Sequence, residues 1–123
     1  MNLFISDLHF GHKAVIDFDH RPFSGVEEMD AEAMSYFVSV DSYLEIADCQ
    51  ERIILSHYPI AEWNNFHHGA YHIYGHIHNR TDEAYQYMKR FDRALNAGAC
   101  INNYTPCSLN ELIRNNKIFR ENN

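Results

Sequence analysis

The chain has 123 residues, and its 46% of hydrophobic residues is too high for an intrinsically disordered protein. Asp and Glu number 17 against 10 Lys and Arg, so the formal net charge is −7. This charge disfavours non-specific binding to nucleic acid or to an anionic membrane, and the length predicts a single domain with a modest core.

The start of the chain and its cysteines indicate a compartment. No apolar run is long enough to span a membrane, and the first residues lack the basic segment and cleavage site of a signal peptide. Cys49, Cys100 and Cys107 lack the spacing of metal-binding pairs. An odd number of cysteines without a secretion signal is typical of reduced thiols, so we expect a cytoplasmic protein.

The predicted strands are short apolar runs in chain order. Residues 2–6 predict a buried strand at the N-terminus, and residues 42–56 predict a β-hairpin that turns near 48–51. A further strand over 70–74 ends at Gly75, and residues 93–99 predict the last core strand.

The predicted helices lie between and after these strands. Residues 12–18 predict a short helix, and a capping box at Ser24 predicts a helix from about Val26 to Phe37. Residues 82–90 predict a third helix with Thr81 as N-cap. A second capping box at Ser108 predicts a helix to about Asn116, and the polar tail over 117–123 is expected to fray.

Aspartate and histidine residues follow three of the predicted strands. Open α/β sheets bind ligands at the carboxyl ends of their strands, so these side chains are expected to meet at one edge. His76 and His78 are two residues apart, and on an extended strand end such residues point to the same side. Carboxylate and imidazole together suit Mn, Fe, Zn or Co. The candidate metal ligands are Asp7, His9, His57, His76 and His78.

Other residues are candidates for supporting roles. His12 and Arg21 are candidate catalytic residues, because either could bind phosphate through charge or hydrogen bonds. For Arg21 the alternative is a surface ion pair with a nearby aspartate. His72 lies on a strand-like stretch and is a candidate to line the site. Cys100 is either a ligand for a soft metal or a buried thiol.

The motifs together resemble the calcineurin-like metallophosphoesterase family, in particular its small bacterial members. Flanking segments are similar as well, namely Phe10-Gly-His12, Arg21-Pro-Phe23, His57-Tyr-Pro59 and Leu95-Asn-Ala-Gly98. The resemblance implies an α/β fold, an α-β-β-α sandwich with mixed sheets. It also implies a metal-dependent phosphoesterase, which hydrolyses a phosphomonoester or phosphodiester with metal-activated water. Its substrate would be a small phosphorylated molecule, without a membrane or nucleic acid as partner.

The resemblance also implies a ligand set for each of two metals. Asp7, His9 and His78 would hold the first metal, and His57 and His76 would hold the second. His12 would replace the acid that protonates the leaving oxygen, because the family's own catalytic histidine is missing here.

Two family motifs are missing from this sequence. One is Gly-Asp, whose carboxylate bridges the metals, and the other is Gly-Asn-His-Asp, which supplies a ligand and the catalytic histidine. The sequence passes directly from Met34 into Phe37–Val40, which predicts an internal deletion near residues 34–38 of a single domain over 1–123. One or two metal ions are therefore expected, and Asp41 or Asp48 could replace the bridging carboxylate.

The missing block has consequences for assembly and activity. Loss of central strands would leave sheet edges unpaired, and a homo-oligomer, for example a dimer with swapped elements, would cover them. Weak phosphoesterase activity is one expectation for such a chain. The alternative is a non-catalytic protein of this fold that binds a metal or phosphate, or assembles with a partner.

Overall fold

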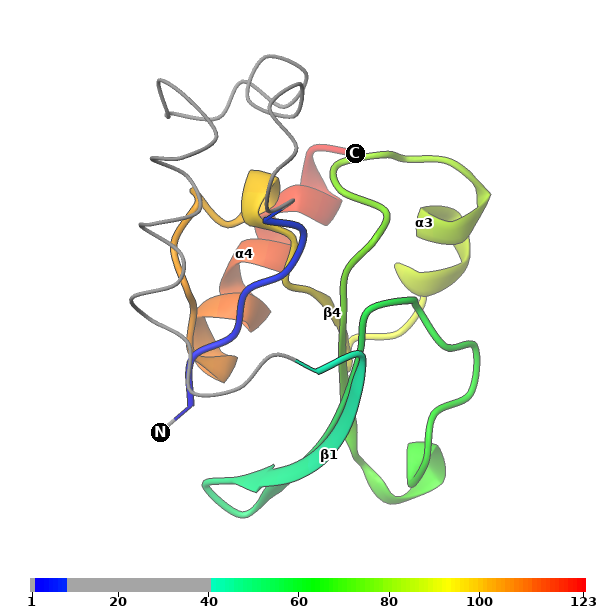
Figure 1. The fold of residues 1–123 in the computed structure, drawn as a ribbon. Coiled ribbons are helices and arrows are strands. Elements are labelled where there is room, and N and C mark those ends of the chain that lie inside the picture. The colour runs from blue at the N-terminus through cyan, green and yellow to red at the C-terminus, as the bar shows by residue number, and fades with distance from the viewer. Residues whose placement is uncertain (1, 9–40) are drawn as a thin grey trace. The chain divides into compact units, whose positions relative to one another are not determined.

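The computed structural model describes residues 2–8 and 41–123 (Figure 1). Residues 2–7 and 41–123 belong to one compact unit with an α/β fold. Two predicted helices, over 12–18 and 26–37, lie outside the described residues. The predicted internal deletion near residues 34–38 lies outside them as well.

A mixed four-stranded sheet in the order β1-β2-β3-β4 forms the centre of this unit. β1 (Tyr43–Asp48) and β2 (Glu51–Ser56) form an antiparallel hairpin, which confirms the hairpin predicted over 42–56. β3 (Tyr71–Tyr74) is parallel to β2, and β4 (Ala94–Asn96) is parallel to β3. β4 is shorter than predicted, because the chain turns at Gly98 into a 3-10 helix, η2 (Ala99–Ile101).

Both faces of the sheet are covered, because successive side chains of a strand point to opposite sides. The buried cluster on one face comprises Phe4, Ile53, Ile73, Leu95, Ala97, Cys107 and Leu112. The buried cluster on the other face comprises Ile54, Trp63, Ala70, Tyr74, Ile77, Tyr85, Met88 and Ala94. The strands therefore reach the site from a scaffold that is packed on both sides.

Helix α3 (Glu83–Met88) packs on the second of these clusters through Tyr85 and Met88. The predicted N-cap, Thr81, is wrong. Asp82 occupies the N-cap position and makes no side-chain capping bond, while the Thr81 carbonyl accepts a hydrogen bond from the Gln86 side chain. The short 3-10 helix η1 (Phe66–His68) precedes β3.

Helix α4 (Leu109–Glu121) begins with the predicted capping box, in which Ser108 and Glu111 each accept a hydrogen bond from the other's backbone N–H. The helix continues five residues beyond the predicted end at Asn116, so the prediction of a frayed tail is wrong. Phe119 packs against the core, and Arg120 donates a hydrogen bond to the Ala94 carbonyl. These tertiary contacts hold the last turns of a polar sequence in the helix.

Helix α4 also covers the edge of β4 (Figure 1). The Asn116 side chain accepts a hydrogen bond from the Asn96 N–H (2.8 Å) and donates one to the Asn96 carbonyl (3.0 Å). It therefore pairs with the strand edge as a neighbouring strand would. This edge does not need a second copy of the chain to satisfy its backbone at Asn96.

The N-terminal segment extends the sheet beyond β4. The predicted strand over residues 2–6 makes two isolated bridges, from Phe4 to Cys107 and from Ser6 to Gly98. Ser6 pairs with the segment that follows β4, since its N–H donates to the Ala97 carbonyl (2.9 Å) and its carbonyl accepts from the Ala99 N–H (3.0 Å). This pairing brings Asp7 to the carboxyl end of β4.

Neither described α-helix has the length and apolar character that a membrane span requires.

His72 is a core residue, which corrects the prediction that it lines the site. Its residue exposure is 0%. Nε2 accepts a hydrogen bond from the Ile60 N–H (2.9 Å), and Nδ1 lies 3.0 Å from the Ile54 carbonyl. Nδ1 must carry the proton in this arrangement, so the imidazole is neutral. Burial lowers the pKa of His72 below its ordinary value of 6.5.

This buried histidine predicts a loss of stability in acid. In the unfolded chain His72 takes up a proton as the pH falls through 6.5, whereas in the folded chain it stays neutral. Its contribution to stability is therefore complete above pH 6.5 and declines as the pH falls toward the lower folded pKa. We expect His72→Gln to lower the free energy of unfolding at pH 7.5 by about 1–3 kcal/mol. It should also flatten the dependence of stability on pH between 7 and 5.

Urea denaturation at several pH values measures both effects. His67→Gln is the matched control, because His67 is exposed and its side chain contacts Glu62 on the surface. Equal pH slopes for the wild-type chain and His72→Gln would contradict the assignment of a neutral buried imidazole.

Candidate metal centre

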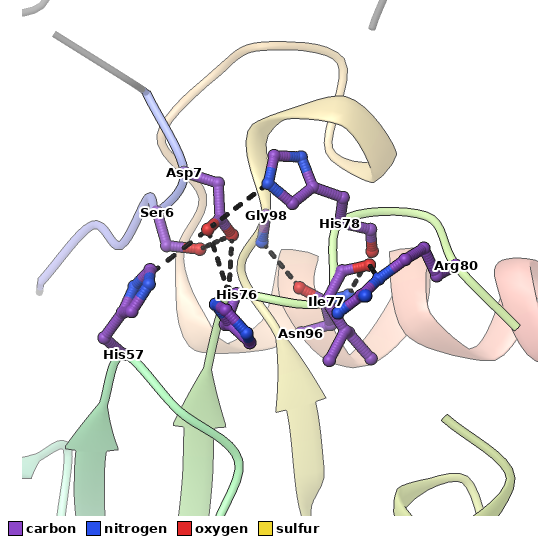
Figure 2. Close-up of polar contacts among 9 residues, drawn as sticks. All are labelled: Ser6, Asp7, His57, His76, Ile77, His78, Arg80, Asn96 and Gly98. Atoms are coloured by element: carbon purple, nitrogen blue, oxygen red, sulfur yellow. Dashed lines mark hydrogen bonds and ion pairs between the residues drawn. The ribbon is translucent and has the colours of Figure 1, made fainter. Parts of the chain in front are cut away.

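The carboxyl ends of three parallel strands and the N-terminal segment meet at one edge of the sheet (Figure 2). His57 follows β2, the turn 75–78 follows β3, and Gly98 follows β4 at the point where it bridges to Ser6. The expectation that strand ends bring these motifs together is confirmed for Asp7, His57 and His78. This edge is where parallel sheets bind ligands.

The carboxylate of Asp7 is the centre of the site. Its side chain is 1% exposed. Oδ2 accepts a hydrogen bond from the Ser6 hydroxyl (2.8 Å), and the His76 N–H lies 2.9 Å from Oδ1 and 3.0 Å from Oδ2. Donors that are part of the backbone and of the neighbouring serine therefore fix the orientation of a buried negative charge.

Two imidazoles face this carboxylate through the same oxygen atom. His57 Nδ1 lies 4.0 Å from Asp7 Oδ1, and His78 Nε2 lies 3.9 Å from it. Figure 2 shows the two rings on opposite sides of the carboxylate. The His78 side chain is 17% exposed and that of His57 is 40% exposed, so the site opens toward His57.

The ring of His76 lies beside His57. Their ring centroids are 5.4 Å apart, and the ring of the exposed Tyr58 lies 4.6 Å from His76 and 4.9 Å from His57. His76 thus contacts Asp7 through its backbone N–H and contacts His57 through its ring. His57 and His76, the pair that the resemblance implies for one metal, therefore lie next to each other.

His76 and His78 do not lie on an extended strand end, so the predicted reason for their shared direction is wrong. β3 ends at Tyr74, and His76 and His78 have φ angles of 72° and 53°, in the left-handed region. Alternation along an extended strand therefore does not set their directions. A tight turn aims them instead, and Asp7 itself has a φ angle of 59°. Such backbone is unfavourable for residues with a Cβ and persists where surrounding contacts hold it.

Two glycines allow the backbones to approach the carboxylate. A Cβ atom at Gly75 would lie 2.4 Å from Ser6 Oγ and 2.8 Å from Asp7 Oδ2. A Cβ atom at Gly98 would lie 2.9 Å from Asn96 Oδ1 and 3.3 Å from Asp7 Oδ2. Gly75 needs glycine for space, because a Cβ atom there would clash with Ser6 and Asp7, whereas at Gly98 the closest clash would be with the Asn96 side chain.

Asn96 is a supporting residue that the sequence reasoning missed. Its side chain donates a hydrogen bond to the His78 carbonyl (2.8 Å) and accepts one from the Gly98 N–H (2.8 Å). It therefore connects the turn that carries His78 to the turn that borders Asp7. Asn96 belongs to the segment Leu95-Asn-Ala-Gly98, which was recognised as similar to the family. The spacing of these residues does not reveal which groups the Asn96 side chain would bond.

The other predicted site residues divide into two groups. His9, His12 and Arg21 lie outside the described residues. The prediction that Asp48 could replace the bridging carboxylate is wrong. Asp48 is the last residue of β1 and pairs with Glu51 at the amino end of β2, whereas His57 follows the carboxyl end of that strand. Its side chain accepts a hydrogen bond from the Asn2 N–H.

Asp41, Cys100 and Tyr74 lie elsewhere around this edge. Asp41 is exposed next to Ser42, whose carbonyl accepts a hydrogen bond from the His57 N–H. Cys100 is half-buried and is not part of a disulfide. Burial raises the pKa of Tyr74 to about 12, so its phenol stays protonated at neutral pH and cannot act as a base there.

The donor set fits divalent transition metals in type and only partly in number. One carboxylate and imidazole nitrogens are hard and intermediate ligands that suit Mn, Fe, Zn or Co. Among residues 2–8 and 41–123, however, no three His, Cys, Asp or Glu side chains are grouped closely enough to hold one ion. Asp7 instead has one imidazole on each side, His57 on one and His78 on the other. Comparison with protein-family models, with curated proteins and with solved structures finds no match for the chain.

Close packing around Asp7 predicts that Gly75→Ala destabilises the fold and disturbs the site. Overpacking of this kind costs about 1–3 kcal/mol of unfolding free energy. The His76 amide, which donates to Asp7, should shift in the ¹⁵N–¹H NMR spectrum.

The control is Gly69→Ala. Gly69 has a φ angle of +83°, and its new Cβ would meet the end of the Arg93 side chain no closer than 3.7 Å. That variant should lose about 1–2 kcal/mol through backbone strain. An unmoved His76 amide in Gly75→Ala would show that the packing around Asp7 is looser than described.

The position of Asn96 predicts a second loss of stability. Asn96→Ala leaves the buried Gly98 N–H and the His78 carbonyl without this partner, at about 1–3 kcal/mol for each group. Chemical denaturation should show a loss of at least about 2 kcal/mol. Asn64→Ala is the control, because Asn64 is exposed and bonds the exposed Glu45, so its change should stay within about 0.5 kcal/mol. Similar losses in the two variants would remove Asn96 from the structure that supports the site.

Proposed function

We propose that this chain is a metal-dependent phosphoesterase that hydrolyses a phosphomonoester or phosphodiester. The observation that carries the proposal is the buried Asp7 carboxylate between two imidazoles, at the carboxyl ends of parallel strands. The motif resemblance to calcineurin-like metallophosphoesterases supports the same reaction class. We propose the truncated sandwich fold of that family on the same motifs.

The proposed roles follow from the positions of the side chains. Asp7 and His78 would bind a cation on the deeper side of the site. The motif resemblance implies His9 as a further ligand of that cation. His57 and His76 would bind a cation on the more open side, where the substrate approaches. Bound divalent cations polarise a phosphoryl oxygen and lower the pKa of a water molecule. His12 and Arg21 are proposed to bind the phosphate group.

The exposure of the side chains indicates where a substrate would approach. Asp7 is buried and held by Ser6 and the His76 N–H, so it orients ligands and does not meet the substrate directly. The exposed faces of His57 and Tyr58 border the open side, and a phosphoester would enter there. Bound cations would attract a negatively charged substrate to this edge, despite the net charge of −7.

A second candidate function is binding without catalysis. The observation that favours it is the absence, among the described residues, of three side chains grouped around one ion. An incomplete set binds cations more weakly and activates water less than a full set. This candidate predicts uptake of metal or phosphate by the purified chain without turnover.

Hydrolysis of bis(p-nitrophenyl) phosphate in the presence of Mn²⁺ tests the first candidate. We expect Asp7→Asn and His78→Ala to reduce kcat/KM at least about 100-fold, since even residues that only support a metal ligand cost 10–100-fold. The control is His67→Ala, because His67 is an exposed histidine of η1 whose side chain contacts Glu62. It should retain wild-type turnover. Full activity in folded Asp7→Asn would show that another site or a contaminant is responsible. Metal uptake without turnover in the wild-type chain would support the second candidate.

A further inference from the structure

Strand β1 has an edge that no other described strand covers. It comes first in the sheet order β1-β2-β3-β4, so β2 lies along only one of its sides (Figure 1). Hydrogen-bonded and non-hydrogen-bonded residue pairs alternate along an antiparallel ladder. The Ser42 carbonyl accepts a hydrogen bond from the His57 N–H, so the alternation starts with a bonded pair at Ser42. Tyr43, Glu45 and Ala47 therefore direct their N–H and C=O groups away from β2.

These outward groups are accessible to a partner. Tyr43, Glu45 and Ala47 are all exposed, and Tyr43 is 48% exposed although it is a large aromatic residue. No other backbone in the described part of the chain pairs with them. An unpaired strand edge is a template on which another strand can add. The opposite edge of the sheet, at β4, is covered by α4, so β1 presents the open edge.

The two faces of this edge differ in character. Tyr43 and Glu45 lie on the exposed face, where the Glu45 carboxylate accepts hydrogen bonds from the Tyr43 hydroxyl (2.6 Å) and the Asn64 amide (3.0 Å). These hydrogen bonds lower the pKa of Glu45, so its carboxylate is negatively charged at neutral pH. On the other face Leu44 and Ile46 are half-buried apolar residues. A matching strand would carry positive charge on one face and apolar side chains on the other.

Charge makes a second copy of β1 a poor partner. Residues 41–48 include three acidic residues, Asp41, Glu45 and Asp48, and no basic residue. Two copies paired along this edge would bring two acidic strands together, and like charges across a strand pair are destabilising. A strand with Lys or Arg beside Glu45 would instead form pairs of opposite charge. The net charge of −7 favours a basic partner as well.

From this edge we infer that β1 is a docking site for an extended basic segment of another protein, which adds to the sheet as an antiparallel strand. Its Lys or Arg side chains lie beside Glu45, and its apolar side chains pack against Leu44 and Ile46. Backbone hydrogen bonds to Tyr43, Glu45 and Ala47 supply affinity, and the alternating side chains supply specificity. The antiparallel direction is the more stable per residue. This inference is independent of the proposed phosphoesterase reaction.

The test uses the full chain and a labelled peptide of three Lys-Val repeats with blocked ends. Fluorescence anisotropy measures its Kd at about 150 mM salt, where distant charges are screened. With lysine beside Glu45 in an antiparallel pair, the lysine N–H groups face β1 and the valine N–H groups face away. N-methylation of the lysines should therefore abolish binding, whereas N-methylation of the valines should preserve it. A Gln-Val peptide should bind at least about 2-fold more weakly than the Lys-Val peptide.

Amide hydrogen exchange locates the bound strand within β1. Binding of the Lys-Val peptide should slow exchange at the N–H groups of Tyr43, Glu45 and Ala47, which point away from β2. Exchange at Leu44 and Ile46 should change less, because their N–H groups already bond to β2. This alternation distinguishes strand addition from attraction between charged surfaces.

Three variants of the chain test the charge and the edge separately. Glu45→Gln should remove most of the preference for the Lys-Val over the Gln-Val peptide. The matched control is Glu121→Gln, an exposed carboxylate of α4 at the opposite edge of the sheet, which should keep that preference. Ala47→Pro removes an outward N–H and no bond to β2, so it should fold and weaken binding roughly 3- to 10-fold. Circular dichroism and thermal unfolding verify that each variant is folded.

Several results would overturn the inference. One is a Lys-Val peptide that does not bind, and another is equal binding of its two N-methylated forms. Equal effects of Glu45→Gln and Glu121→Gln would show that overall charge, and not β1, selects the peptide. Without peptide, protection of the Tyr43 and Glu45 amides that increases with protein concentration would assign the edge to a second copy of the chain.

Discussion

The candidate site depends on the hydrogen bonds between the His76 N–H and the Asp7 carboxylate. They join segments that are 69 residues apart in the sequence. A buried carboxylate without donors would be costly, and the backbone N–H together with the Ser6 hydroxyl offsets that cost. The same contact brings the end of the N-terminal segment against the turn after β3. Gly75 is required because that approach leaves no space for a Cβ atom, and a Cβ atom at Gly98 would clash with the Asn96 side chain.

A second layer of polar contacts supports this one from behind. Asn116 of α4 pairs with the backbone of Asn96, and the Asn96 side chain holds the turns of His78 and Gly98. Asn102 adds hydrogen bonds to the carbonyls of Asn96 and Gly98. Buried polar networks are stabilising when their groups are satisfied and costly when one is removed. The stability of α4 and the geometry at Asp7 are therefore coupled through a row of asparagines.

Side-chain exposure increases across the site, from 1% at Asp7 to 17% at His78 and 40% at His57. In the proposed metal centre the buried Asp7 would hold a cation in place, and the more exposed His57 would leave room for a substrate. Cations that bind this folded arrangement and not the unfolded chain would also stabilise the fold by mass action. His72 supports the site from the core. Its Nε2 accepts a hydrogen bond from the backbone N–H of Ile60, which lies three residues after His57.

The sequence by itself determined the elements whose signals are local. Short apolar runs specify the hairpin and β3, and Ser108 with Glu111 specifies the start of α4. Strand ends that carry Asp7, His57 and His78 also indicated where these side chains meet, because parallel strands end at one edge. Tertiary structure decided the rest. It placed His76 and His78 in left-handed turns, buried His72, extended α4 to Glu121 and gave Asn96 its partners. Each of these outcomes depends on contacts between segments distant in sequence, and no local pattern records them.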